Sequence, residues 1–84
     1  MHAIRVRCRL FARYAEVTGE EEVEVEVPAP ATVADAIAAL RAQLAEGARL
    51  PPHPLVARNR AHALPTDPIA DGDELALLPP LAGG

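Results

Sequence analysis

The chain is organised around its last stretch, Leu75-Ala76-Leu77-Leu78-Pro79-Pro80-Leu81-Ala82-Gly83-Gly84. The stretch begins as an apolar run without alternation, which is typical of a central strand that is covered on both faces or flanks an interface. Pro79 and Pro80 lack the backbone N–H that a sheet ladder needs, so the strand must end before them. The sequence therefore predicts one folded domain over residues 1–78 and an extended tail over residues 79–84.

The tail ends in two residues that carry no side chain. Glycine needs the least room around its backbone and lets another molecule approach closely. Gly83 and Gly84 therefore suit a carboxylate that enters a narrow site on another protein. The alternative interpretation is a frayed terminus, which is the ordinary state of a chain end.

The first third of the chain has the pattern of two paired strands. Residues 4–10 alternate apolar side chains with arginine, and residues 22–27 alternate valine with glutamate. This period of two is typical of half-buried strands. If the strands pair antiparallel, their outward faces bring arginine beside glutamate. Residues 11–17 lose the alternation and predict a turn or one to two turns of helix.

A longer helix is predicted after the second strand. Thr32 is a favourable N-cap, and Asp35 three residues later completes a capping box. Gly47 is expected at the C′ position that ends the helix. The apolar stripe of this helix is formed by Val33, Ile37, Leu40 and Leu44.

Short elements and turns fill the second half of the chain. A short strand is predicted over residues 55–57, and a brief returning strand over residues 63–64. Between them, Asn59 is predicted to take a left-handed turn conformation. Ile69 is expected as an isolated core residue, and Gly72 as a turn residue with positive φ. The order of elements predicts an α+β fold, in which a mixed sheet of four to five strands has one main helix packed across it.

Composition excludes several classes of function. The 84 residues carry a formal net charge of −4, which argues against nucleic acid or an anionic membrane surface as the main partner. No apolar run approaches the roughly 20 residues of a membrane span. Residues 1–5 lack the apolar core of a signal peptide, so a cytoplasmic location is expected.

Few side chains could carry chemistry. Cys8 is the single cysteine and shares the alternation of its strand, so an inert buried thiol is expected. The histidines lack metal-ligand spacing: His2, His53 and His62. There is no serine, no lysine and no phosphate-binding glycine loop. We therefore expect no metal and no bound cofactor, and the reactive group that remains is the carboxylate of Gly84.

A carboxylate is a poor electrophile and must be activated before it reacts. An acyl adenylate would activate Gly84, but forming it requires a separate enzyme that uses ATP. The activated carbonyl could then accept sulfur to give a thiocarboxylate, or accept an amine to give an amide. Both outcomes remain open at this point.

Several segments together resemble a known family. Residues 10–19 are similar to its first strand and following turn, and residues 32–37 to the start of its helix. Residues 56–60, VARNR, are similar to its VAVN segment. Residues 71–84, DGDELALLPPLAGG, match its ending DGDEVAxxPPVxGG. The chain resembles the small, MoaD-like sulfur-carrier subunit of molybdopterin synthase, in the ubiquitin-like β-grasp superfamily.

This resemblance implies a function for the tail. Gly84 is adenylated by a ubiquitin-activating-like adenylyltransferase, and a sulfur donor enzyme converts it to a thiocarboxylate. The tail then enters the large catalytic subunit of a heterotetramer and gives sulfur to cyclic pyranopterin monophosphate. The chain would thus be a sulfur-donating subunit rather than an enzyme on its own. The implied partner-binding residues are Leu78, Pro79, Pro80, Leu81, Ala82 and Gly83.

The chain departs from this family at two places, and other functions share its ending. Residues 77–78 are leucines where the family often has aromatics, and Arg58 stands where an apolar residue is common, so its side chain is expected at solvent or a partner. One alternative is a sulfur carrier for thiamine or cysteine biosynthesis. A second is a ubiquitin-like modifier that joins Gly84 to lysines of targets. A third is a β-grasp binding module with an unreactive end.

Overall fold

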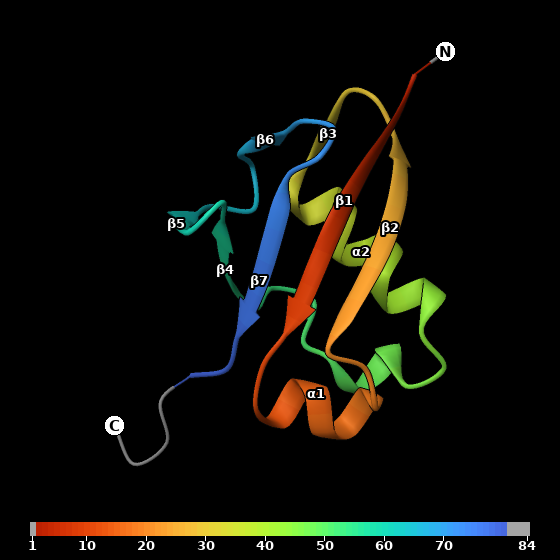
Figure 1. Ribbon diagram of the computed structural model, residues 1–84, viewed down its shortest axis with the longest axis vertical. Helices are drawn as coiled ribbons and strands as arrows, with labels where there is room; N and C mark the ends of the chain where they lie inside the picture. The colour runs from red at the N-terminus through yellow and green to blue at the C-terminus, as the bar shows by residue number, and fades with distance from the viewer. Residues whose placement is uncertain (1, 81–84) are drawn as a thin grey trace.

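A mixed five-stranded sheet with one main helix across it forms the body of the protein, as predicted (Figure 1). The computed structural model describes residues 2–80. The elements are β1 (Ala3–Leu10), α1 (Arg13–Thr18), β2 (Glu22–Pro28), β3 (Ala31–Thr32), α2 (Val33–Gln43), the 3-10 helix η1 (Gly47–Arg49), β4 (Leu55–Arg58), β5 (Ala61–Ala63), β6 (Pro68–Ile69) and β7 (Glu74–Leu78). The strand order in the large sheet is β2-β1-β7-β4-β5.

The first two strands form the predicted antiparallel pair. Arg5 lies opposite Glu26, and the Arg5 Nε atom is 3.0 Å from Glu26 Oε2. Both side chains are largely exposed, so this ion pair contributes little to stability. The other face of the same strands lies beneath α2 and is buried. Its side chains are those of the valines, Ile4, Cys8 and Leu10. The alternation in the sequence therefore separates a charged face from a core face.

Helix α2 begins with the predicted capping box. The Thr32 side-chain oxygen accepts a hydrogen bond from the Asp35 N–H at 3.3 Å, and Asp35 Oδ2 accepts one from the Thr32 N–H at 2.9 Å. Two orphan amides at the helix start are thus satisfied within one turn. The stripe packs on the sheet, because Val33, Ile37 and Leu40 are buried and Leu44 is partly buried.

Strand β7 is central, as predicted, but helix α2 covers only one of its faces. It runs parallel to β1 and antiparallel to β4. Leu75 and Leu77 point into the core and are completely buried. Ala76 and Leu78, on the opposite face, remain half-exposed. This uncovered face of the large sheet, called the open face below, is turned toward the viewer in Figure 1.

The structure differs from the sequence-based expectations in the short elements. Ile69 is buried but not isolated, because β6 pairs with β3 in a separate two-stranded sheet. Strand β5 occupies residues 61–63 rather than 63–64, and β4 extends through Arg58. Segments of two or three residues are too short to show a periodicity, so their pairing is set by tertiary contacts.

Candidate functional site

Strand β7 fixes the point from which the tail leaves the domain. Leu78 is its last residue, and Pro79 and Pro80 follow without regular secondary structure. Pro79 is half-buried and Pro80 is exposed. The other predicted site residues lie outside the described part of the chain: Leu81, Ala82, Gly83 and Gly84. The hydrogen bonds of β7 on both sides therefore set the direction in which the predicted tail starts.

The open face carries an apolar patch at the base of the tail. Cross-strand register places Leu55 opposite Leu78 and Ala57 opposite Ala76 on neighbouring strands. Leu55 is 49% exposed although it is a large apolar residue. We call these four residues, Leu55, Ala57, Ala76 and Leu78, the open-face patch. The sequence indicated only Leu78, because pairing between β4 and β7 cannot be read from either strand alone.

Charged residues occupy the rest of the open face, on β1 and β2. The Arg9 guanidinium lies 5.1 Å from the centre of the Phe11 ring and 4.0 Å from the Glu74 carboxylate. Phe11 is itself 37% exposed and follows directly after β1. The glutamate neighbours, Glu26 first, raise the pKa of the Arg5 guanidinium. The face is therefore apolar at the open-face patch on β4 and β7, and charged on β1, on β2 and at Glu74, the first residue of β7.

The start of β7 is held by a polar cluster that the sequence did not reveal. Asp73 accepts hydrogen bonds from the Ala70 N–H at 2.8 Å and from the Asn59 side-chain amide at 3.0 Å. Asn59 has φ 49°, the predicted left-handed conformation, and its Oδ1 accepts the Glu74 N–H at 2.9 Å. Arg58 Nη1 lies 3.6 Å from Asp73 Oδ2. Arg58 thus forms an ion pair within this cluster while its side chain stays 39% exposed, which accounts for a charge where the resembled family often has an apolar residue.

This cluster predicts an acid-sensitive stability. Burial raises the pKa of Asp73, but the hydrogen bonds from Ala70 and Asn59 and the charge of Arg58 outweigh it, so the pKa is lowered. A lowered pKa in the folded state stabilises the protein above the unfolded pKa of about 3.9, and this contribution is lost as pH falls through the folded value. We expect Asp73→Asn to lower the free energy of unfolding at pH 7 by about 1–3 kcal/mol.

Urea unfolding measured between pH 7 and pH 2.5 checks this prediction. On acidification the free energy of unfolding should fall more for the wild-type protein than for Asp73→Asn. The plots of this free energy against pH should therefore converge at low pH. Glu20→Gln, which removes an exposed acid, serves as the control and should follow the wild-type curve. Parallel curves for wild type and Asp73→Asn would contradict the assignment.

Cys8 is a core residue, as expected. It has no exposed surface, and burial raises the pKa of its thiol to about 12. A thiol with this pKa stays protonated at neutral pH, and the thiolate is the form that acts as a nucleophile. Sulfur chemistry by this side chain is therefore not part of the site.

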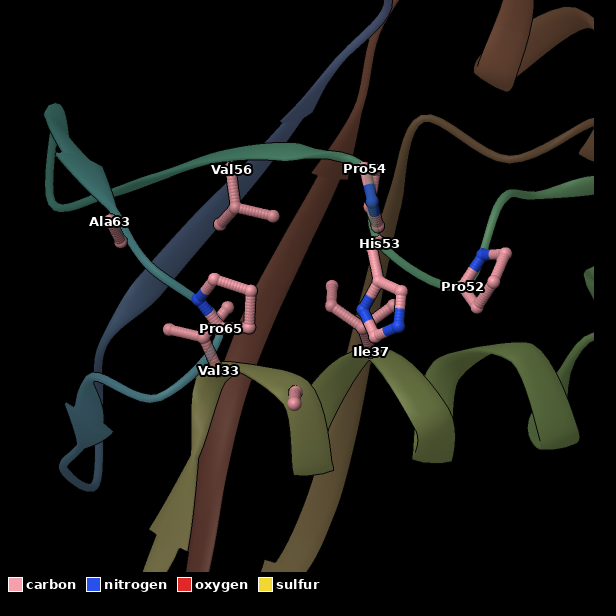
Figure 2. Close-up of a pocket in the computed structure, with 9 residues that line it drawn as sticks. Val33, Ile37, Pro52, His53, Pro54, Val56, Ala63 and Pro65 are labelled. Atoms are coloured by element: carbon pink, nitrogen blue, oxygen red, sulfur yellow. The ribbon is translucent and has the colours of Figure 1, made fainter.

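An apolar pocket lies between α2 and the loop before β4 (Figure 2). Val33 and Ile37 come from the helix, Val56 from β4, and His53 extends from the loop toward Ile37. Its volume of about 10 Å³ is near the size of one water molecule. His53 is exposed at its mouth, as are His2 and His62 elsewhere. The pocket is thus too small for a nucleotide or an organic cofactor.

Two further observations limit the site within the described residues. Residues 2–80 bring no three metal-ligating side chains together. None of the helices found in this part of the chain has the length and apolarity needed to cross a membrane.

Comparison with known proteins gives a consistent picture. The sequence matches the ThiS family over residues 8–84. It is 40% identical over 84 residues to small archaeal modifier protein 1 of Haloferax volcanii, covering 90% of this chain and 97% of that protein. The crystal structure of that modifier superposes with a TM-score of 0.82, covering 95% of this chain and 99% of that one. The β-grasp fold expected from the resemblance is confirmed by this match.

A second solved structure is a complex. Subunits 1 and 2 of the molybdopterin-converting factor from Helicobacter pylori form a protein–protein complex, and one chain of it is 26% identical to this one, with a TM-score of 0.64. The match covers 96% of this chain and 100% of that one. A relative of this fold thus assembles with a partner protein.

Proposed function

This chain belongs to the ThiS family of ubiquitin-like β-grasp sulfur carriers, and on that premise we propose that it is a protein modifier. In this function Gly84 is activated by a separate enzyme that uses ATP and is then joined to amines of target proteins. The observation that carries the proposal is the 40% identity to a small archaeal modifier protein along almost the whole chain. The expectation of a molybdopterin-specific carrier is therefore the second candidate, not the first.

The chemistry assigns one role to this chain and the rest to its partners. A carboxylate oxygen of Gly84 attacks the α-phosphorus of ATP, and pyrophosphate leaves. An amine of the target then attacks the acyl carbonyl, a proton is lost, and AMP departs with the oxygen. The folded domain supplies a binding surface, because the open-face patch lies next to the start of the tail. Pro79 and Pro80 restrict the backbone between this domain and the terminal glycines.

The second candidate is a sulfur carrier in the formation of molybdopterin. The DGDELALLPPLAGG ending and the similarity to a chain of the molybdopterin-converting-factor complex support it. Here hydrosulfide released by a sulfur donor attacks the activated carbonyl, and AMP departs with the shared oxygen. The thiocarboxylate that remains is used by the large subunit of the synthase. A carrier for thiamine or cysteine biosynthesis would share this step. Both candidates share adenylation of Gly84 and differ in the acceptor.

Mass spectrometry of the source cells distinguishes the acceptors. The chain has no lysine, and its last arginine is Arg60, so trypsin leaves residues 61–84 attached to a modified lysine. Target lysines that carry this remnant would establish the modifier. An intact chain in which sulfur replaces one oxygen, with no such remnants, would establish the carrier instead. Neither product in cells that express the chain and its adenylating enzyme would contradict both candidates.

A further inference from the structure

A second surface feature lies at the root of the tail, beside the open-face patch. It is an open hollow of about 460 Å³ between α1, η1 with the segment that follows it, and Pro80. We call it the arginine hollow. Its lining consists of Arg13, Tyr14, Val17, Arg49, Pro51 and Pro80.

The charges in this hollow are of one sign. Arg13 is exposed and forms no ion pair within residues 2–80. Arg49 has one partner, Glu46, whose carboxylate oxygen is 3.5 Å from Arg49 Nη1. Both members of that pair are more than half exposed, so their mutual attraction is small. The two guanidiniums are therefore available to another anion.

Tyr14 adds a third polar group to the lining. The residue is only 6% exposed, yet within residues 2–80 the hydrogen bond that involves Tyr14 beyond the backbone ladder is accepted by its carbonyl and not by its hydroxyl. The hydroxyl is also not a buried unsatisfied atom, so solvent reaches it. Two guanidiniums can only donate hydrogen bonds, and a phenol can donate one. This set of donors fits an oxyanion.

The position of the hollow indicates where that oxyanion comes from. Pro80 lines it, and the four residues that follow span at most about 13 Å. A protein that encloses Gly84 therefore lies close to the hollow, and its surface around the tail is in position to cover it. Covering two guanidiniums removes them from water, which is unfavourable unless the covering surface supplies matching negative charge. A nucleotide that reacts at Gly84 would instead lie at the far end of those four residues.

We propose that the arginine hollow receives the carboxylate of an aspartate or glutamate on the activating enzyme that encloses the tail. This inference rests on the proposed adenylation of Gly84 and adds an electrostatic contact to it. The open-face patch gives that enzyme an apolar surface on one side of Pro79. The hollow adds a charged anchor formed by α1 and η1 near the start of the tail.

The experiment is ATP–pyrophosphate exchange by the cognate adenylating enzyme, with this protein as the varied substrate. The Arg13→Gln/Arg49→Gln variant should raise KM at least roughly tenfold with little change in kcat, because the lost contacts serve binding. Arg60→Gln, an exposed arginine in the β4–β5 turn, is the matched control and should leave KM unchanged. Glu46→Gln frees Arg49 and should lower KM by up to about fivefold.

The outcomes separate this inference from the proposed function. Wild-type protein that supports no exchange contradicts the adenylation of Gly84 and removes the inference with it. Exchange with the same KM for the double variant and for Arg60→Gln contradicts the inference alone. NMR titration with AMP and with inorganic phosphate tests the other source of an oxyanion. Saturable shifts at Arg13, Tyr14 and Arg49 at physiological concentrations would assign the hollow to a nucleotide and overturn the proposal.

Discussion

Deleting Gly84 is expected to reduce adenylation of the chain by roughly a hundredfold or more, because a small misplacement of reacting atoms is enough to cause such a loss. The shortened chain still ends in glycine, but its carboxylate is withdrawn by about 3.3 Å, the length of one extended residue. The measurements are ATP–pyrophosphate exchange and the intact mass after incubation with the activating enzyme. The buried core lies within residues 4–77, so the urea midpoint should not change.

A variant of equal length separates two requirements of the enzyme's site: the distance that the tail must span and the space beside the reacting carbon. Gly84→Ala keeps the carboxylate at its full distance from Leu78 but adds a methyl group next to it. If the site is narrow as well as distant, this variant also loses activity, whereas a loss confined to the deletion shows that reach alone matters. Full adenylation of the deleted chain would contradict the assignment of Gly84 as the activated residue.

The sequence predicted those parts of the fold that local patterns encode. A period of two marked β1 and β2, and Thr32 and Asp35 marked the start of α2. The apolar run before Pro79 marked a central strand. The β3–β6 pairing and the arginine hollow were not predicted, because each brings together segments far apart in the chain. Arg13, Arg49 and Pro80 share no motif, and only the packing of α1 beside η1 gathers them.

The sequence predicted the family correctly, but it favoured sulfur as the acceptor of the activated carbonyl, whereas the comparisons favour an amine of a target protein. Sulfur transfer and protein modification both need an activated terminal glycine on a thin tail. Under either proposal the domain would present the same tail, and the partner enzymes would select the acceptor. The residues of this chain describe how the tail is presented. They carry little information about which nucleophile, an amine or a sulfur, attacks the activated carbonyl.

The prediction for Gly47 was wrong, and the structure gives another reason for glycine there. Helix α2 ends at Gln43, and its C-cap is Leu44 in an extended conformation. Gly47 instead begins η1, is buried, and packs against the backbone of Arg41. A Cβ atom at position 47 would lie 2.6 Å from the Arg41 carbonyl carbon and 2.8 Å from its Cα, and closer still to the carbonyl oxygen. Glycine is required by this close approach rather than by a left-handed turn.

Gly47→Ala is therefore expected to lower the free energy of unfolding by about 3 kcal/mol, near the upper end for overpacking, because backbone rather than a flexible side chain must move. A domain of this size has only about 4–12 kcal/mol to lose. Gly19→Ala is the control, because Gly19 has φ 75° with no atom within 4 Å of an added Cβ, and backbone strain of about 1–2 kcal/mol is its whole effect. Urea unfolding measures both variants, and a smaller loss for Gly47→Ala than for Gly19→Ala would contradict the close approach.

Because η1 also carries Arg49, the Gly47 variant should in addition raise the KM for activation, whereas the Gly19 variant should not.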